Sequence, residues 1–391
     1  MSEILVAGGG IGGLAAALCM ARRGFRVGVF EQAPDFDEPG AGLQLSPNAS
    51  RVIHDLGLEE PLGAKACLPE SLEIRHWKSG RVLAAFPLGE HARATYGYPY
   101  YLVLRSDLVT CLADAARAGH RIELHTGARV ERVHQSRTGV AVSVNGTRHT
   151  GLMLVGADGI NSTVRTALFG NETPTYGGDV AWRALVSATS LPQGMMRPVV
   201  TIWWGPGKHF VHYHAGDSAL VNCVGVVSGQ DEPESWIESG DYAEFLEDFS
   251  QWHPNVRALI DLTERDGCRR WALLDRPPMP SWTDHRVTLL GDACHAALPF
   301  MAQGAAMAIE DASVLSHCIA EGTDVPAALL RYESLRRDRT ALVQHRSRQI
   351  AKTFHLSGLG AWFRNRAVRI VGDRYFRRLF AYNAIDAASE Q

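Results

Sequence analysis

The residues of this chain best suited to chemistry begin with a glycine cluster near the N-terminus. Gly8-Gly9-Gly10-Ile11-Gly12-Gly13 satisfies the pattern GxGxxG, and Glu31 follows 18 residues after Gly13. Glycines let a backbone turn tightly and approach a pyrophosphate, whose charge the N–H groups of a helix N-terminus can bind. A carboxylate at the end of the following strand accepts hydrogen bonds from ribose hydroxyls. The cluster predicts a dinucleotide site, and the alternative is a glycine-rich turn in an ordinary βαβ unit.

Two aspartates follow apolar strands further along the chain. Gly156-Ala157-Asp158-Gly159 comes after the strand Leu152–Val155, with Ser162 and Arg165 just beyond it. Gly291-Asp292-Ala293-Cys294-His295 comes after a strand that ends at Leu290. The glycine cluster alone does not distinguish an NAD site from an FAD site, so the distinction depends on these two motifs.

The elements around the glycine cluster read as a βαβ unit. We expect a strand over Ile4–Ala7, a helix from about Gly12 to Arg23 and a second strand over Arg26–Glu31. The middle of the chain is different, because β-rich runs there are separated by Gly and Pro turns, as in an antiparallel sheet. These runs are Ala181–Val186, Val199–Trp204, His209–His214 and Ala219–Val227.

After Trp271 the nucleotide-type pattern returns, with a strand over Val287–Leu290 and a long arginine-rich helix over Pro326–Phe354. The predicted fold class is therefore α/β: a discontinuous Rossmann-type cofactor domain, an inserted mixed or antiparallel β-sheet substrate domain, and C-terminal helices. The cofactor domain with its C-terminal helices is assigned to residues 1–76, 101–176 and 270–391. The substrate domain is assigned to residues 77–100 and 177–269.

Composition excludes several classes of protein. The formal charge of −3 comes from a mixed surface and gives no reason to expect a nucleic-acid partner. The seven cysteines form no CxxC pair, which argues against a disulfide framework or a zinc site and fits a reducing cytoplasm. The apolar run Ile4–Met20 lacks a basic region before it and contains several glycines, so we expect neither targeting nor membrane insertion.

With the three motifs together, the chain resembles the group A flavoprotein monooxygenases, the family of para-hydroxybenzoate hydroxylase and salicylate hydroxylase, over nearly its whole length. The resemblance implies FAD as the cofactor and NADH or NADPH as a co-substrate that docks transiently without a Rossmann domain of its own. It places the ADP part of FAD at Gly12 and Glu31, the pyrophosphate at Asp158 and the ribityl chain at Asp292. The expected FAD-binding residues are Gly8, Gly10, Gly12, Gly13, Glu31, Gln32, Gly42, Arg105, Val130, Asp158, Asp292, Pro299, Gly304 and Ala305.

Two of these places have simpler alternatives. Arg105 matches the family arginine near the flavin and pyrophosphate, but it could also be a surface arginine at a helix start. The loop Pro299–Gly304 leads into a predicted helix, whose N-terminus would stabilise the negative charge of reduced flavin at its N1–C2=O edge. The alternative there is a plain buried helix start.

The substrate side rests on a closer resemblance, to the branch with 3-hydroxybenzoate 6-hydroxylase, salicylate hydroxylase and 6-hydroxynicotinate 3-monooxygenase. Gly40–Asn48, His209–Tyr213 and Met301–Ala305 carry it. In that branch the positions of His209, Tyr213 and Gln303 line the aromatic substrate, and these are the expected catalytic residues.

Strand geometry agrees with this expectation. Residues four apart share a face of a strand, so His209 and Tyr213 can point into one cavity while His212 faces away. A neutral imidazole could take the proton of a substrate hydroxyl, which makes the ring electron-rich enough to attack a flavin C4a-hydroperoxide. The alternative is a polar sheet face without a catalytic role.

The roles of several other polar and aromatic residues near these motifs have two interpretations each. Gln303 could hydrogen-bond the substrate or cap the helix at Gly304, and His295 could act in catalysis or fix its loop. Trp203, Trp204 and Phe300 could form an aromatic wall or pack in the core.

Three departures from the resembled branch bear on the substrate. Ala296-Ala297 stands where several relatives have proline, Phe300 stands where hydroxynicotinate enzymes have a polar residue, and the same subgroup differs at Pro47. These changes favour a benzenoid phenol over a nitrogen heterocycle.

The leading hypothesis is a single-component monooxygenase that uses NAD(P)H and O2 to hydroxylate a phenolic acid resembling 3-hydroxybenzoate or salicylate, as a monomer or homodimer. An FAD oxidase or reductase of the same fold would yield peroxide rather than an oxygenated product. A flavin-binding sensor would not turn over.

Overall fold

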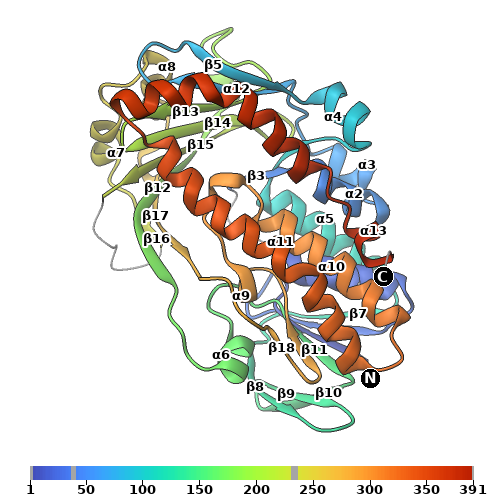
Figure 1. Ribbon diagram of the computed structural model, residues 1–391. Coiled ribbons are helices and arrows are strands. Elements are labelled where there is room, and N and C mark those ends of the chain that lie inside the picture. The colour runs from blue at the N-terminus through green and yellow to red at the C-terminus, as the bar shows by residue number, and fades with distance from the viewer. Residues whose placement is uncertain (1–2, 37–40, 230–236, 390–391) are drawn as a thin grey trace.

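The computed structural model of the protein describes residues 3–36, 41–229 and 237–389. Gly40, the first residue of the segment Gly40–Asn48, lies outside the described residues. The chain forms one six-stranded sheet, one eight-stranded sheet and two smaller sheets within this part (Figure 1). Together they place the predicted motifs around a common cavity.

The six-stranded sheet carries the glycine cluster and has the strand order β18-β19-β11-β1-β2-β7. All its pairings are parallel except that of β18 with β19. The inner strands β1, β2, β11 and β19 are short and fully buried, as expected for a sheet covered on both faces, whereas β7 and β18 at its edges are more polar. The strands are β1 (Ile4–Ala7), β2 (Val27–Phe30), β7 (Ile122–His125), β11 (Met153–Gly156), β18 (Thr283–Asp284) and β19 (Val287–Leu289).

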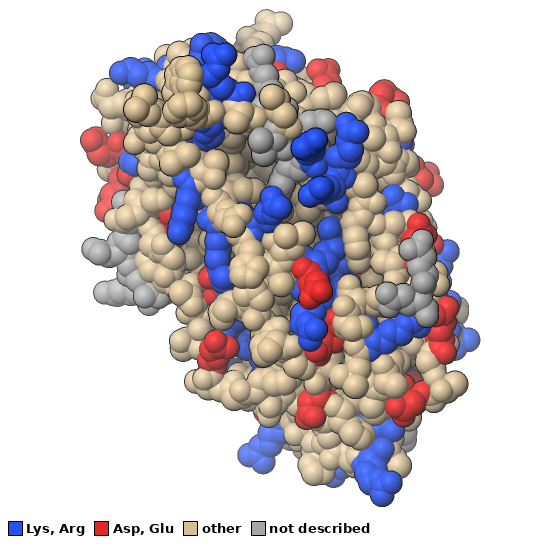
Figure 2. Space-filling model, viewed as in Figure 1, with Lys and Arg blue, Asp and Glu red and all other residues tan. Residues whose placement is uncertain are grey.

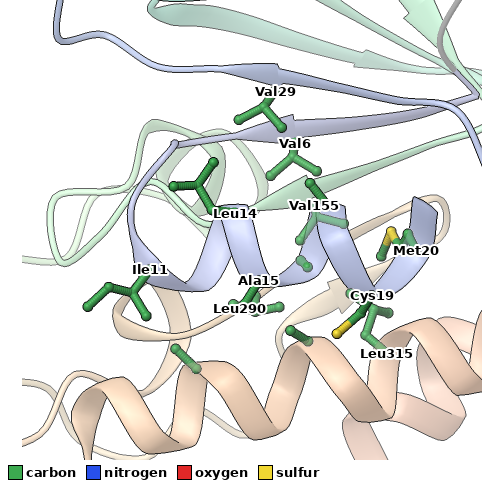
Figure 3. Packing of buried hydrophobic residues seen from close by; sticks show 14 of the residues in the cluster. Val6, Ile11, Leu14, Ala15, Cys19, Met20, Val29, Val155, Leu290 and Leu315 are labelled. Atoms are coloured by element: carbon green, nitrogen blue, oxygen red, sulfur yellow. The ribbon is translucent and has the colours of Figure 1, made fainter. Parts of the chain in front are cut away.

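Helix α1 (Ile11–Arg22) lies between this sheet and helix α10 (Gly304–Glu321). Figure 3 shows Leu14 of α1 toward Val6 and Val29 of the sheet, and Cys19 toward Leu315 of α10. All of these side chains are buried. Because burial of apolar surface stabilises roughly 25 cal/mol per Å2, this packing holds the N-termini of both helices beside the sheet edge.

The eight-stranded sheet has the order β16-β17-β12-β15-β14-β13-β4-β5. Its pairings are antiparallel except for the parallel pair β13 and β4. The four predicted β-rich runs are confirmed as β12, β13, β14 and β15. The strands are β4 (Ser71–His76), β5 (Val82–Pro87), β12 (Thr175–Ser187), β13 (Val199–Gly205), β14 (Lys208–Ala215), β15 (Leu220–Ser228), β16 (Ile237–Ser239) and β17 (Arg269–Asp275).

Strands β4 and β17 belong to this sheet, although most of their residues fall in ranges assigned above to the cofactor domain. Helices α7 (Tyr242–Asp248) and α8 (Pro254–Asp261) pack on one face of the sheet through Phe245 and Leu259. Side chains on the opposite face therefore remain available to a cavity.

The remaining elements connect and cover the two large sheets. The strands are β3 (Gly42–Leu45) with β6 (Tyr101–Leu104), and the antiparallel β8 (Val130–Gln135), β9 (Val140–Val144) and β10 (Thr147–Gly151). The helices are α2 (Pro47–Asp55), α3 (Glu59–Gly63), α4 (Gly89–Tyr96), α5 (Arg105–Ala118), α6 (Thr163–Phe169), α9 (Asp292–His295), α11 (Val325–Phe354), α12 (Gly358–Phe380) and α13 (Ala384–Ser389). Short 3-10 turns occupy Ala188–Ser190, Arg265–Gly267 and Pro299–Met301.

Helices α11 and α12 cross one side of the molecule, and Figure 2 shows Lys and Arg side chains gathered on that side. Not all arginines of the predicted arginine-rich helix face solvent, however. Arg336 is fully buried and pairs with Glu310 and Asp311 of α10. Part of that arginine content therefore serves the interior. Within the described residues, no helix combines the length and apolarity needed to cross a membrane.

Candidate cofactor and substrate site

The glycine cluster forms the turn between β1 and α1, and its members have different roles. Gly8 has φ of +98°, and a Cβ there would lie 2.3 Å from the carbonyl oxygen of Ala157. A Cβ on Gly13 would lie 1.9 Å from the carbonyl oxygen of Gly8. A Cβ on Gly10 would meet no heavy atom of the described residues within 4 Å. Two glycines thus permit the turn, while the third leaves open space over the N-terminus of α1.

Glu31 follows the end of β2, as the sequence predicted. Its carboxylate accepts hydrogen bonds from the backbone N–H of Gly9 at 2.5 Å and of Ala33 at 2.8 Å. The same side chain therefore shapes the glycine turn and lines the cavity, together with Gln32.

Asp158 lies at the N-terminus of α6. It accepts hydrogen bonds from Ser162 Oγ at 2.5 Å and from the N–H of Thr163 at 2.7 Å. Burial raises the pKa of Asp158, and these hydrogen bonds oppose that rise. Nearby, Arg165 donates to the carbonyl oxygens of Ile160 and Ala293, at 3.0 and 3.2 Å. Arg165 thus ties the Asp158 motif to the Asp292 motif, which is 134 positions away in sequence.

The Asp292 motif begins α9 and rests on a buried charge cluster. Asp292 itself is exposed, whereas His295 is fully buried with Nε2 2.6 Å from Asp311 Oδ2. Asp311 Oδ1 also accepts from Nε of Arg336 at 2.7 Å. Burial alone would raise the pKa of Asp311, but His295 and Arg336 lower it to about 2. His295 does not line the cavity, so the structure favours its loop-fixing alternative.

Gln303 precedes α10, but its side chain does not cap the helix. Its Nε2 donates to Ser46 Oγ at 2.9 Å, and its Oε1 accepts from Asn48 Nδ2 at 3.0 Å. The helix-cap alternative is therefore wrong, because Ser46 and Asn48 of the distant α2 region satisfy the amide instead. Gln303 is buried and still forms part of the cavity wall.

Strand β14 presents His209 and Tyr213 to the cavity, and His212 to the opposite face, as its alternation predicted. The Nδ1 of His209 lies 2.8 Å from Nε2 of His355, whereas its Nε2 has no hydrogen-bond partner among the described residues. Burial, with His355 beside it, lowers the pKa of His209 well below the usual range. Burial raises the pKa of Tyr213, although Arg183 and Gln44 oppose that rise. At neutral pH the pair is thus a neutral imidazole and a neutral phenol.

Aromatic side chains surround His209. The ring centroids of Phe300 and Phe354 lie 5.2 and 5.3 Å from that of His209. Trp204 also lines the cavity, whereas Trp203 packs in the core on the other face of the sheet. The aromatic-wall alternative therefore holds for Trp204 and Phe300, and the core alternative for Trp203.

One continuous cavity of about 1470 Å3 joins these parts. Pockets for a single small ligand usually measure roughly 300–1,000 Å3, so this one has room for a dinucleotide and a second molecule. Every residue expected at the cofactor or catalytic site lies on its wall except Gly13, which packs beneath the turn. Arg105, at the start of α5, is on the wall, so it is not merely a surface residue.

Several wall or supporting residues lie outside any motif. Asn222 of β15 accepts from the N–H of Gly42 at 2.9 Å, and a Cβ on Gly42 would lie 2.5 Å from Asn222 Cβ. Arg183 of β12 lines the cavity, with its guanidinium 4.4 Å from the Trp271 ring centroid. Its buried Nε has no hydrogen-bond partner in the part of the chain that the structure describes. Arginines are common on strands, so no local sequence pattern identifies Arg183 as a cavity residue.

The cavity residues around the glycine turn and Asp292 fit an FAD molecule. The open space over Gly10 at the N-terminus of α1 suits a pyrophosphate. The exposed carboxylate of Asp292 lies near the N-terminus of α10, 4.0 Å from where a Cβ on Gly304 would be. The second helix N-terminus provides N–H groups for the electronegative edge of a flavin.

Comparison with known proteins agrees with this geometry. Residues 1–347 match the model of a family described as FAD binding domain, so the chain belongs to this family of FAD-binding proteins. The fold has a close counterpart in a solved salicylate hydroxylase substrate complex, with a TM-score of 0.83 at 23% identity over 99% of this chain and 97% of that one.

Named relatives narrow the class further. The chain is 38% identical to 3-hydroxybenzoate 6-hydroxylase of Polaromonas naphthalenivorans over 365 residues, covering 93% of this chain and 90% of that protein. It is also 38% identical to 6-hydroxynicotinate 3-monooxygenase of Pseudomonas fluorescens over 354 residues, covering 88% and 89%. The protein is an FAD-dependent monooxygenase, which confirms the predicted fold class and cofactor.

Proposed function

We propose that this enzyme uses NADH or NADPH and O2 to hydroxylate a phenolic aromatic acid resembling 3-hydroxybenzoate or salicylate. One observation carries the proposal: the buried His209, whose Nε2 has no hydrogen-bond partner among the described residues, faces an aromatic-walled part of the cavity that also contains the glycine turn. Bound FAD, reduced by the nicotinamide, would supply the activated oxygen, and the protein positions the ring beside it.

Different predicted residues would bind different parts of the FAD molecule. Gly12 and Glu31 would hold the ADP part, Asp158 with the N–H groups of the Gly8–Gly13 turn the pyrophosphate, and Asp292 the ribityl chain. Gly304 and Ala305, at the N-terminus of α10, would face the flavin. Gln32, Gly42, Arg105, Val130 and Pro299 would also contact FAD.

His209 would act as the general base on the substrate hydroxyl. Its lowered pKa keeps the imidazole neutral, and the free Nε2 can accept the phenolic proton. Tyr213, four residues along the same strand, would hydrogen-bond the substrate as a neutral phenol. Gln303, which also lines the cavity and is held in place by Ser46 and Asn48, would hydrogen-bond the substrate as well.

Arg183 and Phe300 support an acidic, benzenoid substrate. The unsatisfied Nε of Arg183 is buried, so an anionic group entering the cavity would complete its hydrogen bonding. Phe300 offers an apolar surface where a polar heterocycle gains no hydrogen bond. We therefore expect 3-hydroxybenzoate or salicylate to be preferred over 6-hydroxynicotinate.

The test begins with purified enzyme and its FAD absorbance. Each of the three acids is added with NADH or NADPH, and nicotinamide oxidation is compared with hydroxylated product formed. Product that matches nicotinamide consumption supports the proposal. Peroxide without ring hydroxylation would instead identify an oxidase or reductase, and bound FAD without turnover would identify a flavin-binding sensor.

A second test isolates the base. His209→Ala should lower kcat by about 10^2- to 10^4-fold, the usual contribution of general acid–base catalysis. His214→Ala is the matched control, because His214 lies on the same strand but outside the cavity wall. Normal turnover by His209→Ala would reject the proposed base.

The remaining proposals concern the whole protein. The segments 1–76, 101–176 and 270–391 would form the FAD-binding domain, and 77–100 with 177–269 the substrate domain.

The seven cysteines are free and buried, which supports a cytoplasmic location. The enzyme would act as a monomer or homodimer, and size-exclusion chromatography with light scattering distinguishes the two.

A further inference from the structure

His209 is the first of four side chains that are hydrogen-bonded in series. Its Nδ1 lies 2.8 Å from Nε2 of His355, and Nδ1 of His355 lies 2.6 Å from Oγ of Ser228. Ser228 in turn donates a hydrogen bond to the carboxylate of Asp179. The residues come from β14, the end of α11, β15 and β12, so only the tertiary fold assembles the series.

The series leads out of the cavity wall. His209 is 3% exposed, whereas His355, Ser228 and Asp179 are each half-buried. The N–H donors and lone pairs match in one direction throughout: each imidazole can donate from one nitrogen while accepting at the other. No link is longer than an ordinary hydrogen bond.

Charge explains why a proton would not stay on either histidine. An imidazolium at His209 would be buried beside the rings of Phe300 and Phe354, and burying a charge without a counter-charge costs free energy. Burial, with the nearby Arg364 guanidinium, lowers the pKa of His355 to about 4. At the far end, burial raises the pKa of Asp179, which its hydrogen bond from Ser228 opposes. Burial therefore makes this carboxylate a better proton acceptor than an ordinary exposed aspartate.

We propose that His355, Ser228 and Asp179 form a proton relay, which carries the phenolic proton of the substrate from His209 toward solvent. As the O–H bond of the phenol breaks, its proton binds Nε2 of His209, and the Nδ1 proton of His209 passes to Nε2 of His355. The Nδ1 proton of His355 then passes to Ser228 Oγ, whose own proton passes to Asp179.

The proton balance has two consequences. Each imidazole ends neutral with its proton on the opposite nitrogen, the serine keeps one proton on Oγ, and no electrons are transferred. The negative charge moves from Asp179 to the substrate oxygen, so no imidazolium has to persist in the apolar cavity. Asp179 then releases its proton to water, and the series returns to its first orientation.

The inference rests on the proposed function, because it requires a phenolic substrate beside His209. His355, Ser228 and Asp179 touch no substrate and act through His209, so they are positioning residues. A purely structural role would orient the His209 ring without moving protons. The two roles differ in their response to substitutions that keep the hydrogen bonds but cannot pass a proton.

His355→Gln and Asp179→Asn are such substitutions, and His214→Gln is the matched control on β14. Oxidised, FAD-loaded enzyme is mixed rapidly with 3-hydroxybenzoate or salicylate, whichever the wild-type enzyme hydroxylates faster, in weak buffer with a pH indicator and no nicotinamide. We expect proton release at least about tenfold slower in both variants, unchanged in the control, and accelerated by added imidazole in His355→Gln.

Equal rates of proton release in wild type, His355→Gln and Asp179→Asn would overturn the relay, as would slow rates that imidazole and other small buffers leave unchanged. If His355→Gln fails to bind FAD, Asp179→Asn and Ser228→Ala at the outer end decide the question. Wild-type enzyme that hydroxylates neither acid would reject the proposed function and the relay with it. Normal wild-type hydroxylation with unaffected variants rejects the relay alone.

Discussion

Gly8→Ala is the substitution whose effect the structure defines most sharply. Gly8 has φ of +98°, and an alanine Cβ would lie 2.3 Å from the carbonyl oxygen of Ala157 and 2.9 Å from Cα of Asp158. Both neighbours are backbone atoms of the Asp158 motif, so no side-chain rotation relieves the overlap. The turn and the strand end must separate.

Gly24→Ala provides a matched control, because Gly24 also has φ of +98° but a Cβ there would meet nothing within 4 Å. The left-handed backbone costs about 1–2 kcal/mol for alanine at either position. The overlap at Gly8 adds about 1–3 kcal/mol, the usual cost of overpacking. We therefore expect a loss of unfolding free energy of about 2–5 kcal/mol for Gly8→Ala and about 1–2 kcal/mol for Gly24→Ala.

Urea unfolding of the apoprotein measures both losses, and titration with FAD measures cofactor affinity. Gly8→Ala should also weaken FAD binding, because the shifted turn carries the N–H groups proposed to hold the pyrophosphate. Gly10→Ala should leave the stability of the apoprotein unchanged, because its Cβ enters open space, but it should lower the affinity for FAD. Gly24→Ala should instead lower stability only. Equal destabilisation by Gly8→Ala and Gly24→Ala would refute the reasoning.

Three further predictions concern charge. Asp311→Asn leaves the buried Arg336 without its full partner set and should lower the free energy of unfolding by about 3–5 kcal/mol in urea; a loss below about 1 kcal/mol would contradict this. Burial alone would raise the pKa of Asp311, but His295 and Arg336 lower it from 3.8 to about 2. The contribution of the ionised Asp311 to the free energy of unfolding is therefore complete above pH 3.8 and is lost as the pH falls toward 2. That loss is about 2 kcal/mol, and urea midpoints that stay constant over this range would disprove it. Burial lowers the pKa of His209 below 6.5, so kcat/KM should show no acid limb at pH 6.5; such a limb, absent from His209→Ala, would exclude a neutral His209 at lower pH.

The sequence determined the local parts of this protein. The glycine turn, four strands of the six-stranded sheet, four strands of the eight-stranded sheet and the helix over residues 325–354 follow from periodicity and turn residues. The other strands of the two sheets were not predicted, and β12 begins six residues before its predicted start. Strand alternation also placed His209 and Tyr213 on one face and His212 on the other. These features depend on neighbouring residues only, which is why one sequence contains enough information to predict them.

Tertiary structure decided which groups those residues meet. Gln303 could be read equally as a helix cap, until the fold brought Ser46 and Asn48, more than 250 positions away, against its amide. His355 lies 146 positions from its partner His209, at a helix end that carries no motif. Such contacts depend on how helices and sheets pack, and packing is set by the summed burial of the whole core rather than by local spacing. Through the family resemblance, the sequence therefore indicated a flavin and an aromatic substrate, whereas the fold brought together the side chains proposed to carry a proton from that substrate toward solvent.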